Sequence, residues 1–302
     1  MSTYQLDTAS WPATYAEQAR PRMGFFTDTS VCIGCKACEV ACKEWNEVPE
    51  DGLHFTGRSY DNTGHLGADS WRHVAFVEQR KPLSVESASE SFVDAAARMQ
   101  VAQENGLSEH RDAEGLRWLM SSDVCKHCTS AACLEVCPTG ALFRTEFGTV
   151  VVQEDVCNGC GYCVPACPFG VLDRRKDDGR VWKCTLCYDR LKNDMEPACA
   201  KACPTDSIQF GPLDDLREHA VQRIGTLHGS GVTDARLYGE DPHNGVGGFG
   251  AFFLLLDEPE TYGLPPDPVS TTRDLPRMLR TTALAIGAMG AGLVVSFVGG
   301  RR

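Results

Sequence analysis

The sequence predicts an α+β fold in which two small cysteine-rich modules are nested and a single helix follows at the C-terminus. Two observations support this fold: 16 of the 302 residues are cysteines, and these fall into four groups of regular spacing. A third observation is the segment 281–300, which carries no charged residue. A hydrophobic content of 42% and a charged content of 23% are typical of folded globular proteins, which excludes wholesale disorder and fibrous repeats.

Four motifs of four cysteines account for every cysteine in the sequence. The first and third motifs have the spacing C-x2-C-x2-C-x3-C, the second has C-x2-C-x4-C-x3-C, and the fourth has C-x2-C-x11-C-x3-C. Proline follows the last cysteine of motifs two, three and four. In sequence order the motifs are Cys32, Cys35, Cys38 and Cys42; Cys125, Cys128, Cys133 and Cys137; Cys157, Cys160, Cys163 and Cys167; and Cys184, Cys187, Cys199 and Cys203.

This spacing predicts four [4Fe–4S] clusters, with zinc sites and disulfides as the alternatives. C-x2-C-x2-C-x3-C-P is the cysteine run of bacterial ferredoxins, whereas zinc sites pair two C-x2-C units across a spacer. Disulfides need an oxidising compartment. The residues up to Phe26 predict no cleavable signal peptide, because Trp11, Glu17 and Arg20 interrupt any apolar run.

The spacing also indicates how the clusters pair. Three close cysteines on a tight loop can bind three irons of one cluster, whereas the fourth, at the start of a helix, reaches a neighbouring cluster. Gly34, Gly159 and Gly161 let backbone N–H groups approach the sulfurs, and such hydrogen bonds tune the reduction potential. We therefore expect two dicluster modules of the ferredoxin-like type.

The boundaries of these modules follow from the residues between the motifs. Two β-prone runs around Phe147 and Gly148 predict a hairpin between motifs two and three, so residues 123–169 form the inner module. Motifs one and four have no such neighbour, which predicts that they pair across space in an outer module of residues 25–83 and 170–262. Segments 25–31 and 207–210 are the expected outer strands.

Two further segments precede and interrupt the modules. Residues 1–24 are an N-terminal extension, and residues 84–122 are an insertion. Phe92, Ala96 and Met99 have helical spacing, so we expect the insertion to be a surface amphipathic helix, or alternatively an element that docks a partner.

The region after motif four predicts a helix over 213–223, a glycine-rich turn over 239–250 and a strand from Ala251. A phosphate-binding loop is the alternative for the glycine-rich stretch. No lysine and no strand–loop–helix context accompany it, which favours the turn.

The C-terminal tail predicts a membrane anchor. Residues 263–280 form a proline-rich linker, and residues 281–300 form an uncharged stretch long enough to cross a bilayer as a helix. A buried helix of a soluble protein is the alternative. We expect the protein to associate with the cytoplasmic membrane, but arginines flank both ends of the stretch, so the positive-inside rule does not choose a side.

Charge and motif content exclude several functions. The protein has 29 basic and 41 acidic residues, a formal charge of -12, which disfavours a nucleic-acid partner. No Ser/His/Asp arrangement, paired-carboxylate pattern or dinucleotide-binding fingerprint occurs, so we expect no catalytic residue. His127, beside Cys128, is expected at the surface or in a hydrogen bond, since the cysteines already supply all ligands.

With these motifs, the protein resembles the four-cluster iron–sulfur subunits of molybdopterin-dependent oxidoreductases, and among them the beta subunits of membrane-associated formate dehydrogenases. The resemblance spans about residues 24–211 and is carried by DTSVCIGCKAC from Asp28, KCTLCYDR from Lys183 and EPACAKACPT from Glu196. The uncharged tail is also similar, while the insertion at 84–122 has no counterpart. Nitrate reductase relatives replace one cysteine with tryptophan, and this sequence does not.

The resemblance implies four ligand sets, each with three cysteines from one motif and the fourth from another. Set 1 is Cys32, Cys35, Cys38 and Cys203; set 2 is Cys42, Cys184, Cys187 and Cys199; set 3 is Cys125, Cys128, Cys133 and Cys167; and set 4 is Cys137, Cys157, Cys160 and Cys163.

The resemblance further implies an electron-transfer subunit that performs no bond chemistry itself. Electrons from formate, oxidised at a molybdenum or tungsten pterin in a catalytic subunit, would pass through four clusters to an integral-membrane subunit that reduces quinone. The motifs do not separate this function from that of the iron–sulfur subunit of a polysulfide or dimethyl sulfoxide reductase. A free-standing polyferredoxin is a third alternative, against which the uncharged tail argues.

Replacing Cys137 with alanine should damage the cluster of set 4 and leave the cluster of set 1 intact, because the two sets share no ligand. Low-temperature EPR and iron content, compared with roughly 16 irons for four clusters, measure the outcome. Equal loss of the signals from both modules in a folded variant would contradict the ligand sets.

Overall fold

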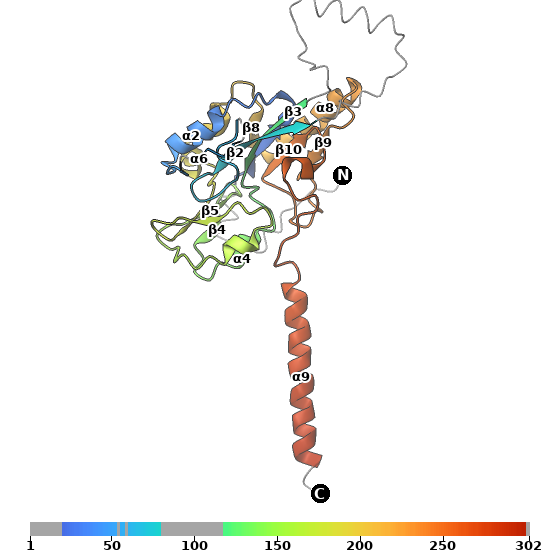
Figure 1. The fold of residues 1–302 in the computed structure, drawn as a ribbon. Coiled ribbons are helices and arrows are strands. Elements are labelled where there is room, and N and C mark those ends of the chain that lie inside the picture. Colours follow the sequence, from blue (N-terminus) through green and yellow to red (C-terminus); the bar gives the residue numbers. More distant parts are fainter. Residues whose placement is uncertain (1–19, 53–54, 58–59, 80–116, 300–302) are drawn as a thin grey trace, which may run out of the picture.

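A four-stranded mixed sheet organises the upper part of the molecule in Figure 1. The computed structural model describes residues 20–52, 55–57, 60–79 and 117–299. The strands lie in the order β8 (Ile208–Pro212), β1 (Met23–Asp28), β10 (Ala251–Leu255) and β9 (Arg236–Tyr238). β1 is therefore an inner strand, antiparallel to β8 and parallel to β10.

Burial explains why these residues form the sheet. Every residue of β10 is fully buried, as expected of a continuous apolar run in a strand covered on both faces. α8 (Leu213–Gly229) packs against β1 and β8 and buries Leu213, Leu216 and Ala220, which have helical spacing. The predicted helix from Leu213 and the predicted strand from Ala251 are therefore confirmed.

A second pair of strands lies on either side of the insertion. β2 (Arg72–Gln79) and β3 (Arg117–Val124) are antiparallel along their whole length. The prediction of a helical insertion over 84–122 is wrong for residues 117–122, which lie in β3. The physical reason is their pairing with β2, a strand that was not predicted, and the burial of Leu119 and Ser121 on alternate positions. Residues 84–116 lie outside the described residues.

Motifs one and four lie side by side. β1, before motif one, pairs with β8, after motif four. α2 (Ala37–Trp45), within motif one, packs against α7 (Ala198–Lys201), within motif four. The first outer strand ends at Asp28 and not at residue 31, because the backbone turns there into the 3-10 helix η2 (Thr29–Val31). Such contacts are what nested modules require, while the module boundaries stay a prediction.

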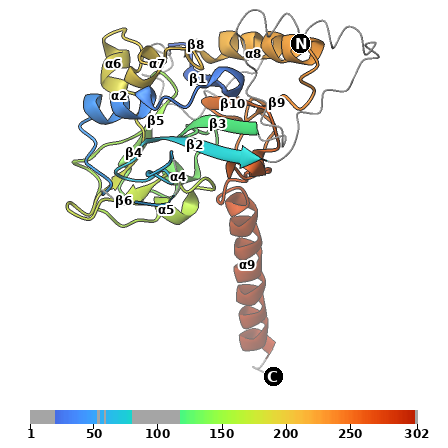
Figure 2. The ribbon, with the colours of Figure 1, turned by 45° about the horizontal axis from the view of Figure 1, so that its top comes forward.

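Motifs two and three are joined by the predicted hairpin. β4 (Leu142–Arg144) pairs with β5 (Val150–Val152), which confirms it. The remaining elements of this part are α4 (Ala132–Glu135), α5 (Cys163–Ala166) and the ladder of β6 (Asp173–Arg174) with β7 (Val181–Trp182). Figures 1 and 2 show these inner elements on the side from which the C-terminal helix projects, and α2 and α6 (Tyr188–Lys192) on the far side.

The proline-rich linker is attached to the body. After the 3-10 helix η3 (Pro259–Tyr262), Tyr238 donates its hydroxyl to Pro265 O at 2.6 Å, and the Thr271 hydroxyl donates to Ala166 O at 3.1 Å. α9 (Leu275–Gly299) begins at Leu275 and not at Thr281, so the helix includes the last residues of the predicted linker. From there α9 projects away from the body as a single rod (Figure 1).

The glycine-rich stretch 239–250 forms the predicted turn and covers motif two. Ser130 N donates to Val246 O at 2.8 Å, and Thr129 N donates to Gly248 O at 3.1 Å. Gly239 has a φ of 92°, and a Cβ at this position would lie 1.8 Å from the ring of Phe249. Glycine is therefore required at the start of this turn.

Replacing Gly239 with alanine should destabilise the protein. The left-handed backbone costs about 1–3 kcal/mol once a Cβ is present, and displacement of the Phe249 ring costs a further ~1–3 kcal/mol. Thermal unfolding of the purified protein measures the effect.

The matched control is Gly225→Ala within α8, where a Cβ would meet no atom of the described residues within 4 Å. Alanine there should stabilise the helix by about 1 kcal/mol. The two variants should therefore shift the unfolding midpoint in opposite directions, and a Gly239→Ala midpoint at or above that of the wild type would show that the turn is not constrained in this way.

Candidate metal centres

The structure brings together the cysteines of each predicted set. The four thiols of set 1 line one cavity, those of set 3 line a second and those of set 4 line a third. In set 2, burial and then Cys184, Cys199 and Cys187 raise the pKa of Cys42 well above its ordinary value, so these four thiols are also neighbours. Ligation itself stays a prediction.

The x3 spacing of each motif explains how neighbouring sets are joined. Cys38 and Cys42 are one helical turn apart on α2, and both are buried. Residues four apart lie on the same helix face, so α2 presents one thiol to set 1 and the next to set 2. In motif two, Cys133 lies on α4 and Cys137 lies two residues beyond its end, so this short segment presents one thiol to set 3 and the next to set 4.

Left-handed backbone positions shape the loops that carry the other cysteines. Gly34 in motif one has a φ of 65°, and Leu186 in motif four has a φ of 57°. In the motif-four loop, Leu186 N donates to Cys184 Sγ at 3.3 Å, and in motif three the sulfur of Cys157 accepts at 3.5 Å from Val181 N of β7. Hydrogen bonds of this kind tune the potential of a cluster.

Burial keeps most of these thiols protonated when no metal is bound. Burial, with Cys125 and Cys199 nearby, raises the pKa of Cys184 to about 12. Burial also raises the pKa of Cys133 to about 12, despite the opposing charge of Lys183. Because metals bind thiolates, loading these sites must release protons.

Buried cations lie among the thiols, and the motif analysis missed them. Lys126, Lys183 and Arg72 are 1%, 1% and 2% exposed. Lys183 Nζ donates to Cys184 O at 2.8 Å and also to Val150 O. The positions of Lys126 and Lys183, each beside a motif cysteine, could have indicated them, whereas no sequence signal marks Arg72.

His127 is buried, so the expected hydrogen-bonding role is confirmed and the surface role is not. Its Nδ1 accepts a hydrogen bond from Val150 N at 3.1 Å. Burial lowers the pKa of His127 well below its ordinary value, which makes the ring neutral. Its Nε2 has no hydrogen-bond partner among the described residues, and His127 lines the cavity of set 3.

The donor groups fit a metal cluster better than a single ion. Within the described ranges, no group of three or more His, Cys, Asp or Glu side chains is arranged to hold one metal ion. Three sets of four thiols instead surround cavities. Buried Nε and Nη2 of Arg72 and Nε2 of His127 also lack partners in the part of the protein that the structure describes, as expected of groups that face bound inorganic sulfide or thiolate.

The sets lie next to one another in the order 1, 2, 3, 4. At each junction between two successive sets, the pKa of a thiol in one set is raised first by burial and also by a thiol of the other set, so the two thiols are neighbours. The two thiols that are exposed belong to the end sets. The junction thiols are Cys38 and Cys199, Cys184 and Cys125, and Cys133 and Cys163, and the exposed thiols are Cys35 and Cys160.

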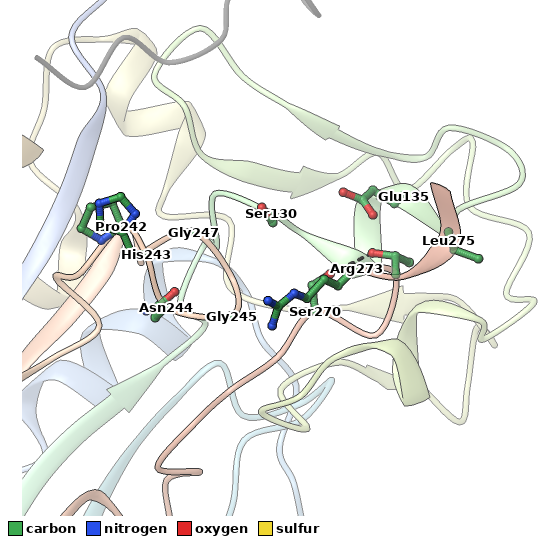
Figure 3. Close-up of a pocket in the computed structure, with 11 residues that line it drawn as sticks. Ser130, Glu135, Pro242, His243, Asn244, Gly245, Gly247, Ser270, Arg273 and Leu275 are labelled. Atoms are coloured by element: carbon green, nitrogen blue, oxygen red, sulfur yellow. Dashed lines mark hydrogen bonds between the residues drawn. The ribbon is translucent and has the colours of Figure 1, made fainter. Parts of the chain in front are cut away.

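A separate cavity of about 590 Å³ lies at the root of α9 (Figure 3). Ser130 and Glu135, from the region of motif two, line it together with Arg273 and Leu275. It has no cysteine in its lining, so it belongs to none of the four sets. It does show that the inner elements adjoin the start of α9.

Comparisons with known proteins agree with this chemistry. Two family models, both described as 4Fe-4S dicluster domains, match residues 31–141 and 116–213. Together with the 16 cysteines, they support four [4Fe–4S] clusters as the cofactors of this protein.

Similar proteins cover almost the whole sequence. The nitrate-inducible formate dehydrogenase iron–sulfur subunit of Escherichia coli (strain K12) is 36% identical over 295 residues, which is 95% of this protein and 88% of that subunit. The formate dehydrogenase iron–sulfur subunit of Haemophilus influenzae is 36% identical over 95% of this protein and 83% of its own length. A subunit of the anaerobic dimethyl sulfoxide reductase of Escherichia coli (strain K12) is 35% identical over 65% of this protein and 76% of its own length. Identity of this extent shows that the protein belongs to the family of formate dehydrogenase iron–sulfur subunits.

Proposed function

We propose that this protein conducts electrons from a formate-oxidising subunit, which holds a molybdenum or tungsten pterin, to an integral-membrane subunit that reduces quinone. When bound, the [4Fe–4S] clusters supply the one-electron sites. The observation that carries the proposal is the line of four thiol sets, which runs from exposed Cys35 in set 1 to exposed Cys160 in set 4.

Each set is proposed to hold one cluster with its four cysteines. The convergence of sets 1, 3 and 4 on separate cavities supports this assignment. The interactions among the thiols of set 2 support it for the remaining cluster. The protein's own part is to fix the spacing of the sets and to leave an exposed thiol only in set 1 and in set 4, so that electrons arrive and leave at these two ends.

The catalytic subunit is proposed to dock at set 1. α2, which carries Cys38 of this set, lies in the half of the body far from α9 (Figure 2). Around it, Ile33, Val40 and Trp45 are 58%, 59% and 43% exposed. Exposed apolar side chains beside a redox site suit a protein interface that excludes water.

The membrane subunit is proposed to dock on the opposite side, beside set 4 and α9. α9 is long and apolar enough over Arg277–Val298 to cross a membrane, and none of this stretch is buried in the described body. Leu284, Val295 and Phe297 are therefore exposed. A bilayer would cover them, which supports a location at the cytoplasmic membrane.

A second candidate function is the same role in a dimethyl sulfoxide or polysulfide reductase, with electrons flowing the other way. The similarity to the subunit of anaerobic dimethyl sulfoxide reductase favours it over the shared region. That similarity covers 65% of this protein, compared with 95% for the formate dehydrogenase subunits, so formate oxidation is preferred. A free-standing polyferredoxin would have no use for α9.

Two matched variants of the purified complex test whether electrons from formate enter at set 1 and leave at set 4. Cys35→Ala should remove the cluster of set 1, so formate should no longer reduce the other clusters, although dithionite still does. Cys160→Ala should remove the cluster of set 4 and leave reduction of the other three by formate unchanged. Low-temperature EPR after addition of formate, with iron content measured in parallel, separates these outcomes.

Rapid reduction of all remaining clusters by formate in Cys35→Ala would refute set 1 as the place where electrons arrive. Reduction by dithionite but not by formate in the unaltered complex would instead exclude formate as the substrate. Dimethyl sulfoxide should then be tested as an oxidant of the prereduced complex.

The anchoring role of α9 is tested without the membrane subunit. Ala288→Asp places a charge near the centre of the helix, at a cost of roughly 2.5–3.5 kcal/mol for membrane insertion. The Ala288→Asp variant should be found in the soluble fraction and should keep its iron. The Ala288→Val variant should stay in the membrane fraction. Equal membrane fractions for Ala288→Asp, Ala288→Val and the unaltered protein would mean that α9 is not the anchor.

A further inference from the structure

Arg72 is a buried cation with few partners of its own. It opens β2 and is 2% exposed. Its Nη1 donates to Ser122 O at 3.2 Å and to Ser122 Oγ at 3.0 Å. Its Nε and Nη2 are buried and have no hydrogen-bond partner among the described residues. The Cys199 thiol lies within hydrogen-bonding reach of the guanidinium, so the acceptor on this side of Arg72 is sulfur and no oxygen acceptor is in place.

No carboxylate of the described residues compensates this charge. Among them, no Asp or Glu forms an ion pair with Arg72, whereas Arg117, Arg175 and Arg223 each have one. The ring of Phe25, 4.9 Å from the guanidinium carbon, contributes only a weak attraction. A buried charge without a counter-charge is costly, so the negative charge that Arg72 faces must come from elsewhere.

The surroundings of Arg72 identify that negative charge. Burial lowers the pKa of Arg72, and four neighbouring thiols raise it. In order of their effect these are Cys199, Cys38, Cys184 and Cys42. Cys38 belongs to set 1 and the other three to set 2, so Arg72 lies at the junction of these two sets. Ser122, which holds the guanidinium, has its hydroxyl 3.2 Å from Cys38 Sγ.

We propose that Arg72 is the shared counter-cation of the clusters held by sets 1 and 2, and that it raises the reduction potential of both. A reduced cluster carries one more negative charge than an oxidised cluster, and a fixed positive charge nearby stabilises the reduced form in a water-free interior. Arg72 thus sets the reduction potentials at the junction between sets 1 and 2 without binding either cluster as a ligand. The inference rests on the proposed ligand sets 1 and 2.

Arg72→Gln tests this in the holo-complex, because glutamine keeps a donor for Ser122 and removes the charge. Redox titration followed by low-temperature EPR, with signals assigned through the cysteine variants, is the measurement. We call the clusters of sets 1 and 2 the outer clusters. At the wild-type midpoint potential of each of them, the ratio of reduced to oxidised cluster should fall at least tenfold, which is about 59 mV for a one-electron couple. The clusters of sets 3 and 4 should keep their midpoints.

Arg175→Gln is the matched control. Arg175 is a partly buried arginine, but its Nε donates to Asp69 Oδ1 at 2.9 Å and its guanidinium stacks on Trp182 at 4.1 Å. Because Asp69 already compensates its charge, the same substitution should leave all four midpoints unchanged. A shift of the outer midpoints in Arg175→Gln equal to that in Arg72→Gln would overturn the proposal.

Arg72→Lys decides the matter if Arg72→Gln takes up too little iron. Lysine keeps the charge and loses the planar fork, so the outer midpoints should stay within about a threefold change in the ratio of reduced to oxidised cluster. A lysine variant that loses the outer clusters, or that shifts their midpoints by the full tenfold, would show that the fork has a structural role and would overturn the proposal. Unshifted midpoints in a fully loaded Arg72→Gln variant would also overturn it, without affecting the ligand sets.

Discussion

The structure depends on one constraint, which is that the third and fourth cysteines of every motif are only four residues apart in the sequence and are assigned to different sets. A set can then be completed only if two motifs meet in space. For sets 1 and 2 this requires residues 32–42 to lie against residues 184–203, and the pairing of β1 with β8 and the packing of α2 on α7 bring them there. For sets 3 and 4 the hairpin of β4 and β5 does the same over a much shorter stretch of sequence.

Collecting thiols in this way places like charges in a dry interior, and the core is built to tolerate them. Lys126 and Lys183 are among the largest fully buried side chains, in a region where leucine or phenylalanine would be expected. Lys126 packs over Phe253 at 4.8 Å and is paired with Asp123, while Lys183 donates to two backbone carbonyls. Among the described residues Lys183 forms no ion pair with a carboxylate, so anionic clusters, when bound, would compensate its buried charge.

Local features of the fold could be predicted from the sequence, and features that depend on distant partners could not. The cysteine spacing, the hairpin around Phe147 and the apolar strand from Ala251 are encoded within a few residues each. β2 and β3 could not be predicted as a pair, because residues 80–116 separate them in the sequence and only their pairing in space identifies them as one ladder. Arg72 was missed for the same reason: its role follows from the thiols around it in space, and nothing in its own neighbourhood in the sequence distinguishes it from a surface arginine.

The same constraint that folds the protein also sets the geometry for electron transfer. Residues one helical turn apart have Cβ atoms about 5–6 Å apart, so two sets joined by one helix must be close neighbours. Sets 1 and 2 are joined by α2, and sets 3 and 4 by the short segment from Cys133 on α4 to Cys137 just beyond it, whereas Cys184 and Cys125 provide the contact between the two pairs without a shared helix. That middle junction depends on tertiary packing alone. A fully buried lysine lies beside each of its two thiols: Lys126 follows Cys125, and Lys183 precedes Cys184. Packing of motifs two and three against motifs one and four therefore has two consequences, since it closes the core and keeps sets 2 and 3 close to one another.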